Sequence, residues 1–167
     1  MSSSHVPLYW VCRPFGALGV DALYALMRLR QEVFGVEQKC AYRDADGVDP
    51  VCWHLLGWSS GRQLQASLRI VPPGRKYADA SIGRVVTALE VRGSGLGHEL
   101  VAKGMLRARQ LYPGTRIRIS AQAHLQRFYE RFGFAAVSEP YLEDGVPHIE
   151  MLCGEHERVA LDMPPVV

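Results

Sequence analysis

The segment that most constrains the fold is the run "VVTALEVRGSGLGHEL", residues 85–100. A strand-like apolar stretch leads into three glycines at every second position, and apolar residues at helical spacing follow over 98–112. Glycine at this density costs conformational entropy, so it indicates a backbone that turns tightly or approaches another group closely. Because free N–H groups and the helix dipole meet where a helix begins, the segment predicts an anion site.

The other patterns set strands and helices on both sides of this segment. Helical spacing covers 21–34, 98–112 and 124–134, and residues 35–50 are expected to form an ordered surface loop that ends in turn residues. The strands before the glycine loop predict an antiparallel run, whereas the strand–helix–strand order after it predicts a parallel pair with a crossover. The sequence therefore predicts a single α/β (α+β) domain with a mixed, mostly antiparallel sheet flanked by helices. Strand-like runs occupy 7–15, 53–59, 64–72, 82–89, 116–123, 134–141 and 147–154.

Length and charge limit what the chain does. Its 167 residues suffice for one core, and a formal net charge of +2 does not suggest binding to nucleic acid or to a membrane surface. No apolar run is long enough to cross a bilayer, and no signal-peptide pattern opens the chain. We therefore expect a cytoplasmic protein with a domain over 8–154, tails at 1–7 and 155–167, and no nucleic-acid or membrane partner.

The four cysteines, at positions 12, 40, 52 and 153, follow no repeated spacing. Cys40, Cys52 and His54 raise the question of a metal site. A structural zinc site needs four ligands at recognisable spacing, and no CxxC pair is present. We therefore expect reduced, mostly buried thiols and no metal.

The glycine loop does not match the common nucleotide-binding motifs. A P-loop would end in Gly-Lys-Ser/Thr, and a dinucleotide fingerprint would read GxGxxG with an acidic residue about 20 positions later. The loop reads "RGSGLGH" over 92–98 and meets neither requirement. It is therefore either an anion site of another kind or a turn that needs glycine only for a positive φ.

A family resemblance narrows this choice. Arg92-x-x-Gly95-x-Gly97, after "IGRVVT" and before a helix, resembles the Q/R-x-x-G-x-G/A motif of the GCN5-related N-acetyltransferases, the GNAT superfamily. The segment "ISAQAHLQRFYERFGF" resembles that family's second motif. The chain is more similar to the ElaA-like branch through "LMRLRQEVFGVEQKCAYRDADGVD", "HLLG" and "EDGVPHIEM". Gly35 departs from the pattern, where an aliphatic residue is expected. The resemblance covers residues 8–154 and implies a GNAT-like fold.

The resemblance also implies acetyl-CoA as the co-substrate, without a metal. The backbone of Val85, Val86 and Thr87 would pair with the pantetheine amides like an added strand. His124 either contacts the pantetheine or only caps its helix. The pyrophosphate would be held by the loop made of Arg92, Gly93, Ser94, Gly95, Leu96 and Gly97.

Transfer of an acetyl group to an amine also requires proton donors and acceptors. The departing thiolate needs a proton, and Tyr129 matches the tyrosine that commonly supplies it in the family. The alternative is that Tyr129 only packs, since it forms an aromatic cluster with Phe128 and Phe132 at helical spacing.

The amine must also lose a proton, because an amine with a pKa of about 10.4 is mostly charged at neutral pH. His54, Glu37 and Glu150 are the candidate bases that offset this cost. Glu150 shares a strand face with His148, and both side chains would then point to the acceptor. Each candidate is alternatively a structural or surface polar residue.

Two functions of different classes stay open. The first is an acetyl-CoA-dependent N-acetyltransferase that acts directly on the amine of a small molecule or peptide. The second is a non-catalytic acyl-CoA-binding sensor. A nucleic-acid-binding domain is disfavoured because the arginines fall on different elements without an aromatic platform. The family is consistent with a homodimer, and the acceptor stays open because acceptor loops vary.

Overall fold

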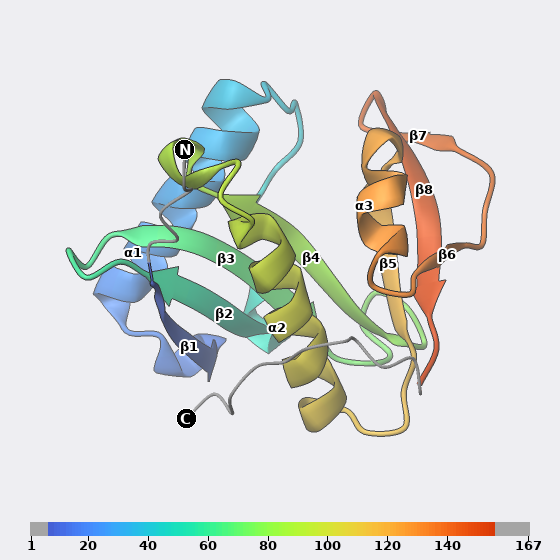
Figure 1. The fold of residues 1–167 in the computed structure, drawn as a ribbon, viewed down its shortest axis with the longest axis horizontal. Coiled ribbons are helices and arrows are strands. Elements are labelled where there is room, and N and C mark those ends of the chain that lie inside the picture. Colours follow the sequence, from blue (N-terminus) through green and yellow to red (C-terminus); the bar gives the residue numbers. More distant parts are fainter. Residues whose placement is uncertain (1–6, 156–167) are drawn as a thin grey trace.

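The computed structural model describes residues 7–155, which form an eight-stranded sheet with helices on both faces (Figure 1). The expected tails therefore lie almost entirely outside the described residues. The strand order is β1-β2-β3-β4-β5-β8-β6, with β7 also paired to β8. All pairs are antiparallel except β4 with β5, which confirms a mixed, mostly antiparallel sheet. The strands are β1 (Tyr9–Pro14), β2 (Trp53–Trp58), β3 (Leu64–Val71), β4 (Ala80–Thr87), β5 (Ile117–Gln122), β6 (Ala135–Ala136), β7 (Tyr141–Glu143) and β8 (Val146–Cys153).

The helices lie on opposite faces of this sheet (Figure 1). Consecutive residues of a strand point to opposite faces, so Leu55 packs in the cluster with α2 and α3, whereas Leu56 packs in the cluster with α1. The first cluster extends across β3, β4, β5 and β8 and is the larger core. The helices are α1 (Val20–Arg30), α2 (Leu96–Leu111) and α3 (Gln126–Glu130), with short turns η1 (Phe15–Ala17), η3 (Asp49–Val51), η4 (Leu89–Val91) and η5 (Ala123–Leu125).

The first helix differs from the predicted range 21–34. The α-helical part ends at Arg30, and a π-helical segment, η2 (Gln31–Glu37), follows it. The N–H of Gln38 accordingly donates to the carbonyl five residues earlier, that of Val33. The wider turn brings the consecutive residues Val33 and Phe34 into the core together, at 4% and 8% exposure.

The C-terminal third also differs from the prediction. The range 134–141 forms only the two-residue strand β6, and β7 begins at Tyr141. The predicted helix 124–134 is limited to η5 and α3. Strand β8 accounts for this pattern, because it pairs with β5, β6 and β7 and so receives the short strands at its edge.

Candidate active site

The parallel pair β4–β5 separates soon after it forms. It consists of two residue pairs, Ala80 with Ile117 and Ser81 with Arg118, and the strands then diverge (Figure 1). Beyond that point β5 follows β8 instead. Among residues 7–155, the β5-facing edge of β4 beyond Ser81 therefore has no strand partner. Such an edge offers backbone N–H and C=O groups to an extended ligand.

A bulge lies where β4 begins to diverge. Ser67 of β3 pairs with Val86, and Arg69 pairs with Gly83, so β4 holds one more residue than β3 between these pairs. Arg84 occupies the bulge at a φ of 50°, an uncommon value for a residue with a side chain. Its guanidinium is held by Asp44, with Nε 2.7 Å from Oδ1. The bulge thus bends β4 next to the space that lies between the separated strands β4 and β5.

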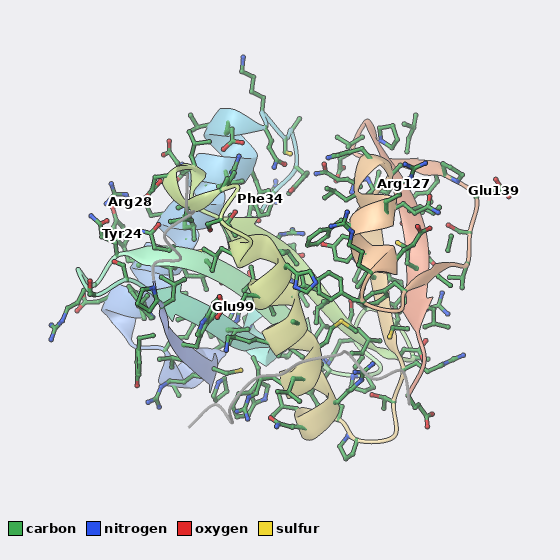
Figure 2. All side chains as sticks on the ribbon, in the orientation of Figure 1. Tyr24, Arg28, Phe34, Glu99, Arg127 and Glu139 are labelled. Atoms are coloured by element: carbon green, nitrogen blue, oxygen red, sulfur yellow. The ribbon has the colours of Figure 1, made fainter. Side chains whose placement is uncertain are left out.

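That space is a cleft of about 370 Å³, within the usual size range of small-molecule sites. One wall is β4, the other is β5 with α3, and the end of the first helix closes the top. Phe34, on that helix end, lies near the far end of β4 (Figure 2). The lining residues are Val33, Phe34, Gln38, Tyr42, Ile82, Gly83, Arg84, Val85, Val86, Thr87, Arg92, Gly97, Ile119, Ser120, Ala121, Gln122, His124, Leu125, Phe128, Tyr129 and His148.

The glycine loop lies at the end of β4 and leads directly into α2. Gly93 and Gly95 have φ values of 78° and 85°, so a turn with positive φ is part of what the loop requires. Gly97 has a different role, since it lies in the first turn of α2 and lines the cleft. A Cβ added at Gly97 would meet no heavy atom within 4 Å. The loop therefore leaves open space where the helix begins.

The residues expected to bind acetyl-CoA fall into two groups. Some line the cleft, and others support the loop from behind. Ser94 donates its hydroxyl to the carbonyl of Val91 at 2.6 Å, and Leu96 is buried in the core at 4% exposure. The residues of the prediction that line the cleft are Val85, Val86, Thr87, Arg92, Gly97 and His124.

Tyr129 packs in the core and also borders the cleft. Its ring makes edge contacts with Phe128 and Phe134, at centroid distances of 5.1 and 5.9 Å, so the side chain is part of the core. The same residue also lines the cleft. Its hydroxyl has no hydrogen-bond partner among residues 7–155. Burial raises the pKa of Tyr129 to about 12, so the phenol keeps its proton at neutral pH.

Glu37 lies at the end of η2 and forms a two-bond ion pair with Arg92, one bond being 2.9 Å long from Nη2 to Oε2. Arg92 also donates to the carbonyl of Thr87 at 3.2 Å. The hydrogen bond from Arg92 lowers the pKa of Glu37, which makes this carboxylate a weaker base. The pair instead ties the end of the first helix to the end of β4.

The structure does not bring His54 to the cleft. The side chain is fully buried on β2, and Nε2 lies 3.1 Å from the carbonyl oxygen of Asp49. Burial disfavours the charged imidazolium and lowers the pKa of His54. His54 does not line the cleft, so its imidazole is not available to an acceptor there.

Glu150 lies on β8 and does not line the cleft either. Its carboxylate accepts a hydrogen bond from Arg118, with Nη1 2.9 Å from Oε2. Arg118 is itself shared with Asp79, at 3.3 Å. Glu150 is therefore engaged in a surface ion-pair group beside the cleft.

Sequence reasoning missed a network of arginines and aspartates below the cleft. Arg30 is 1% exposed and pairs with Asp49 at 2.7 Å, and Arg69 shares the same carboxylate at 3.1 Å. Asp44 bonds both Arg30 of α1 and Arg84 of β4, so together with the Asp49–Arg69 pair the predicted surface loop 35–50 is anchored to α1, β3 and β4. The available signal was the spacing of the acids in "RDADGVD", close in sequence to an arginine within an apolar helix.

Within residues 7–155, no cluster of three or more His, Cys, Asp or Glu side chains is arranged to hold a metal ion. In the same part of the chain, no helix has both the length and the apolar character needed to span a membrane.

Known proteins are similar to this chain in sequence and in fold. The family profile "Acetyltransferase (GNAT) domain" matches residues 64–154. A UPF0039 protein of Synechocystis is 43% identical over 143 residues, which cover 86% of this chain and 93% of that protein. The crystal structure of an acyl-CoA N-acyltransferase from Pseudomonas aeruginosa has 48% identity and a TM-score of 0.84, covering 88% of this chain and 99% of the other. The crystal structure of Escherichia coli ElaA has 40% identity and a TM-score of 0.82, covering 87% and 99% respectively. The chain therefore belongs to the GNAT family of acetyltransferases, and within it to the ElaA-like branch of acyltransferases.

Proposed function

We propose that this protein transfers the acetyl group of acetyl-CoA directly to the amine of a small molecule or peptide. The observation that carries the proposal is the unpaired edge of β4, which ends at the glycine loop and faces Tyr129 across one cleft. The name of the Pseudomonas aeruginosa relative, an acyl-CoA N-acyltransferase, supports an acyl-CoA donor.

Acetyl-CoA would lie along β4 as an added strand. Val85, Val86 and Thr87 line the cleft on the free edge, where their backbone groups are available to the pantetheine amides. The pyrophosphate would lie at the loop from Arg92 to Gly97, because the positive end of the α2 dipole favours an anion there. The open space beside Gly97 suits a backbone that a phosphate approaches closely. His124 would border the pantetheine from the opposite wall.

Tyr129 would act when the thioester breaks. The amine nitrogen attacks the carbonyl carbon, the C–N bond forms, and the C–S bond then releases a thiolate. The Tyr129 hydroxyl donates a proton to that sulfur, and the phenolate regains one from the solvent as the amide nitrogen loses its extra proton. A hydroxyl without an internal partner is free for this role.

Direct transfer is favoured over an acyl-cysteine route. None of the four cysteines is among the cleft residues, and Cys52 and Cys153 are buried. Burial raises the pKa of Cys12 and of Cys52, which leaves their thiols protonated and poorly nucleophilic. Incubation with acetyl-CoA alone should therefore yield no kinetically competent acetyl-cysteine by mass spectrometry.

The test is a screen of amine acceptors with acetyl-CoA, read by release of free thiol and by mass of the acetylated product. Small amines, amino acids and peptide amines are compared as acceptors. CoA thioesters with longer acyl groups are compared with acetyl-CoA as donors. Acceptor-dependent thiol release that is fastest with acetyl-CoA supports the proposal. Tight acetyl-CoA binding without transfer to any amine would favour the sensor, and faster transfer from longer donors would overturn the acetyl assignment.

A further inference from the structure

A histidine on β8 has a fixed proton arrangement beside the cleft. His148 lines the cleft, and its Nδ1 lies 2.8 Å from the carbonyl oxygen of Val146. A carbonyl oxygen only accepts hydrogen bonds, so Nδ1 carries the proton. In the neutral ring, Nε2 then presents a lone pair. The backbone of β8 thus sets the tautomer in which Nε2 can accept a proton.

A carboxylate faces the same nitrogen. Nε2 of His148 is 4.0 Å from Oε2 of Glu143 on β7, a distance that forms an ion pair once the ring is charged. The imidazole also stacks on Tyr141, with ring centroids 6.3 Å apart. The His148 side chain is only 15% exposed, so its position is defined by these neighbours.

Hydrogen bonds hold Glu143 in place. Ser120 donates its hydroxyl proton to Oε2 of Glu143 at 2.7 Å. The Ser120 oxygen lies 2.6 Å from the Tyr141 hydroxyl, and since its own proton is used, Tyr141 must be the donor. The order Tyr141 to Ser120 to Glu143 leaves the carboxylate as the final acceptor. This chain positions the negative charge beside His148.

The other charged groups around His148 have partners of their own. Glu150, two residues along β8, is paired with Arg118. Arg84, on the opposite wall, is paired with Asp44. Lys76 interacts electrostatically with Glu143 from the loop before β4. Glu143 is therefore the carboxylate that faces His148 most directly.

We propose that His148 is the general base that deprotonates the acceptor amine, with Glu143 as its positioning residue. The inference rests on the proposed function and adds to it the base that neither Glu37 nor Glu150 is free to supply. The ammonium of the acceptor gives one proton to Nε2, and its nitrogen gains the lone pair that attacks the thioester carbonyl carbon. The resulting imidazolium forms an ion pair with Glu143 and releases its proton to the solvent after the amide leaves.

The kinetic test compares three variants and one matched control with the wild type. His148→Gln keeps a polar side chain without a basic nitrogen and should lower turnover by about 10²–10⁴-fold, with acetyl-CoA affinity unchanged. It should also remove the acidic limb of the pH profile. His148→Ala should regain activity on addition of imidazole. Glu143→Gln should lower kcat less than His148→Gln does, without raising the KM for acetyl-CoA, since the imidazolium loses its counter-charge.

The matched control is Glu139→Gln, which removes a carboxylate from the exposed outer side of the same half of the molecule (Figure 2). It should leave turnover and the pH profile unchanged. An active wild type together with a fully active His148→Gln variant would overturn the base assignment while leaving the proposed function intact. Thiol release without dependence on any amine would instead count against the proposed function.

A second measurement does not depend on finding the acceptor. Nitrogen chemical shifts of the labelled imidazole report which ring nitrogen carries the proton. We expect the Nδ1–H form of His148 in the neutral ring. A neutral ring protonated at Nε2 would leave no lone pair facing Glu143 and would overturn the proposal even with no acceptor in hand.

Discussion

Replacing Tyr129 by phenylalanine tests the proposed acid with little change to the fold. The ring contacts at 5.1 and 5.9 Å are made by carbon atoms that phenylalanine retains. The hydroxyl has no hydrogen-bond partner among residues 7–155, so its removal costs no internal hydrogen bond. We therefore expect the free energy of unfolding to change by less than about 1 kcal/mol.

The pKa of the phenol determines when its proton can move to the sulfur. Burial raises the pKa of Tyr129 to about 12, whereas a thiol ordinarily has a pKa of about 8.5. Complete proton transfer is uphill by roughly 3.5 units, or about 5 kcal/mol, so the proton must move as the C–S bond breaks. Loss of a positioned acid of this kind lowers turnover by about 10²–10⁴-fold.

The assay is steady-state thiol release with the best acceptor, accompanied by calorimetric titration of CoA and by thermal unfolding. Turnover should fall in Tyr129→Phe while CoA affinity and melting temperature stay close to those of the wild type. Leu142→Ala, an exposed apolar truncation on β7, serves as the control for a general effect of substitution. Near-full turnover of a folded Tyr129→Phe protein would refute the reasoning and assign the residue to packing alone.

Three further predictions concern the cleft, the buried network and alkaline stability. Gly97→Leu should weaken CoA binding at least about 10-fold in titrations, because the larger side chain fills the open space at the start of α2. Gly97 does not have a positive φ, so the substitution does not strain the backbone, and Gly97→Ala should weaken binding less. Asp49→Ala should lower the free energy of unfolding by roughly 3–5 kcal/mol in denaturant titrations, because it leaves Arg30 and Arg69 without their shared carboxylate. Burial alone would raise the pKa of Asp49, but Arg30 and Arg69 outweigh it and hold that pKa low; its stabilisation is therefore present above about pH 4 and lost as pH falls further. Burial raises the pKa of Tyr129 to about 12, so the free energy of unfolding should fall as pH rises from about 10 to 12. The Tyr129→Phe variant should lack up to roughly 3 kcal/mol of this alkaline loss when unfolding is measured against pH.

The sequence contained enough to predict the elements around the glycine loop. The strand, the glycine loop and the helix that follows are local features, and each is encoded by spacing within a few residues. The hairpin that joins β2 to β3 is local in the same way, since Arg62 adopts a φ of 57° and its N–H donates to the carbonyl of Ser59. The π-helical segment was missed because an apolar helix pattern does not reveal a change in helical pitch.

The tertiary structure decided which polar side chains meet. His54 lies in an apolar run and His148 alternates with apolar residues, but neither pattern tells which histidine borders the cleft. The difference arises because β2 is covered on both faces, whereas β8 follows β5 away from β4 and keeps one face beside the opening. Contacts such as Arg84 with Asp44 span 40 residues of sequence.

The sequence by itself therefore determined the order of strands and helices as far as α3, the glycine loop and the family to which the chain belongs. Only the tertiary structure decided where the sheet opens, which carboxylates are already neutralised by arginines, and which histidine borders the cleft. The physical reason is the distance along the sequence over which each kind of interaction acts. Backbone preferences and side-chain periodicity act between near neighbours, whereas burial and ion pairing depend on which distant strands become adjacent.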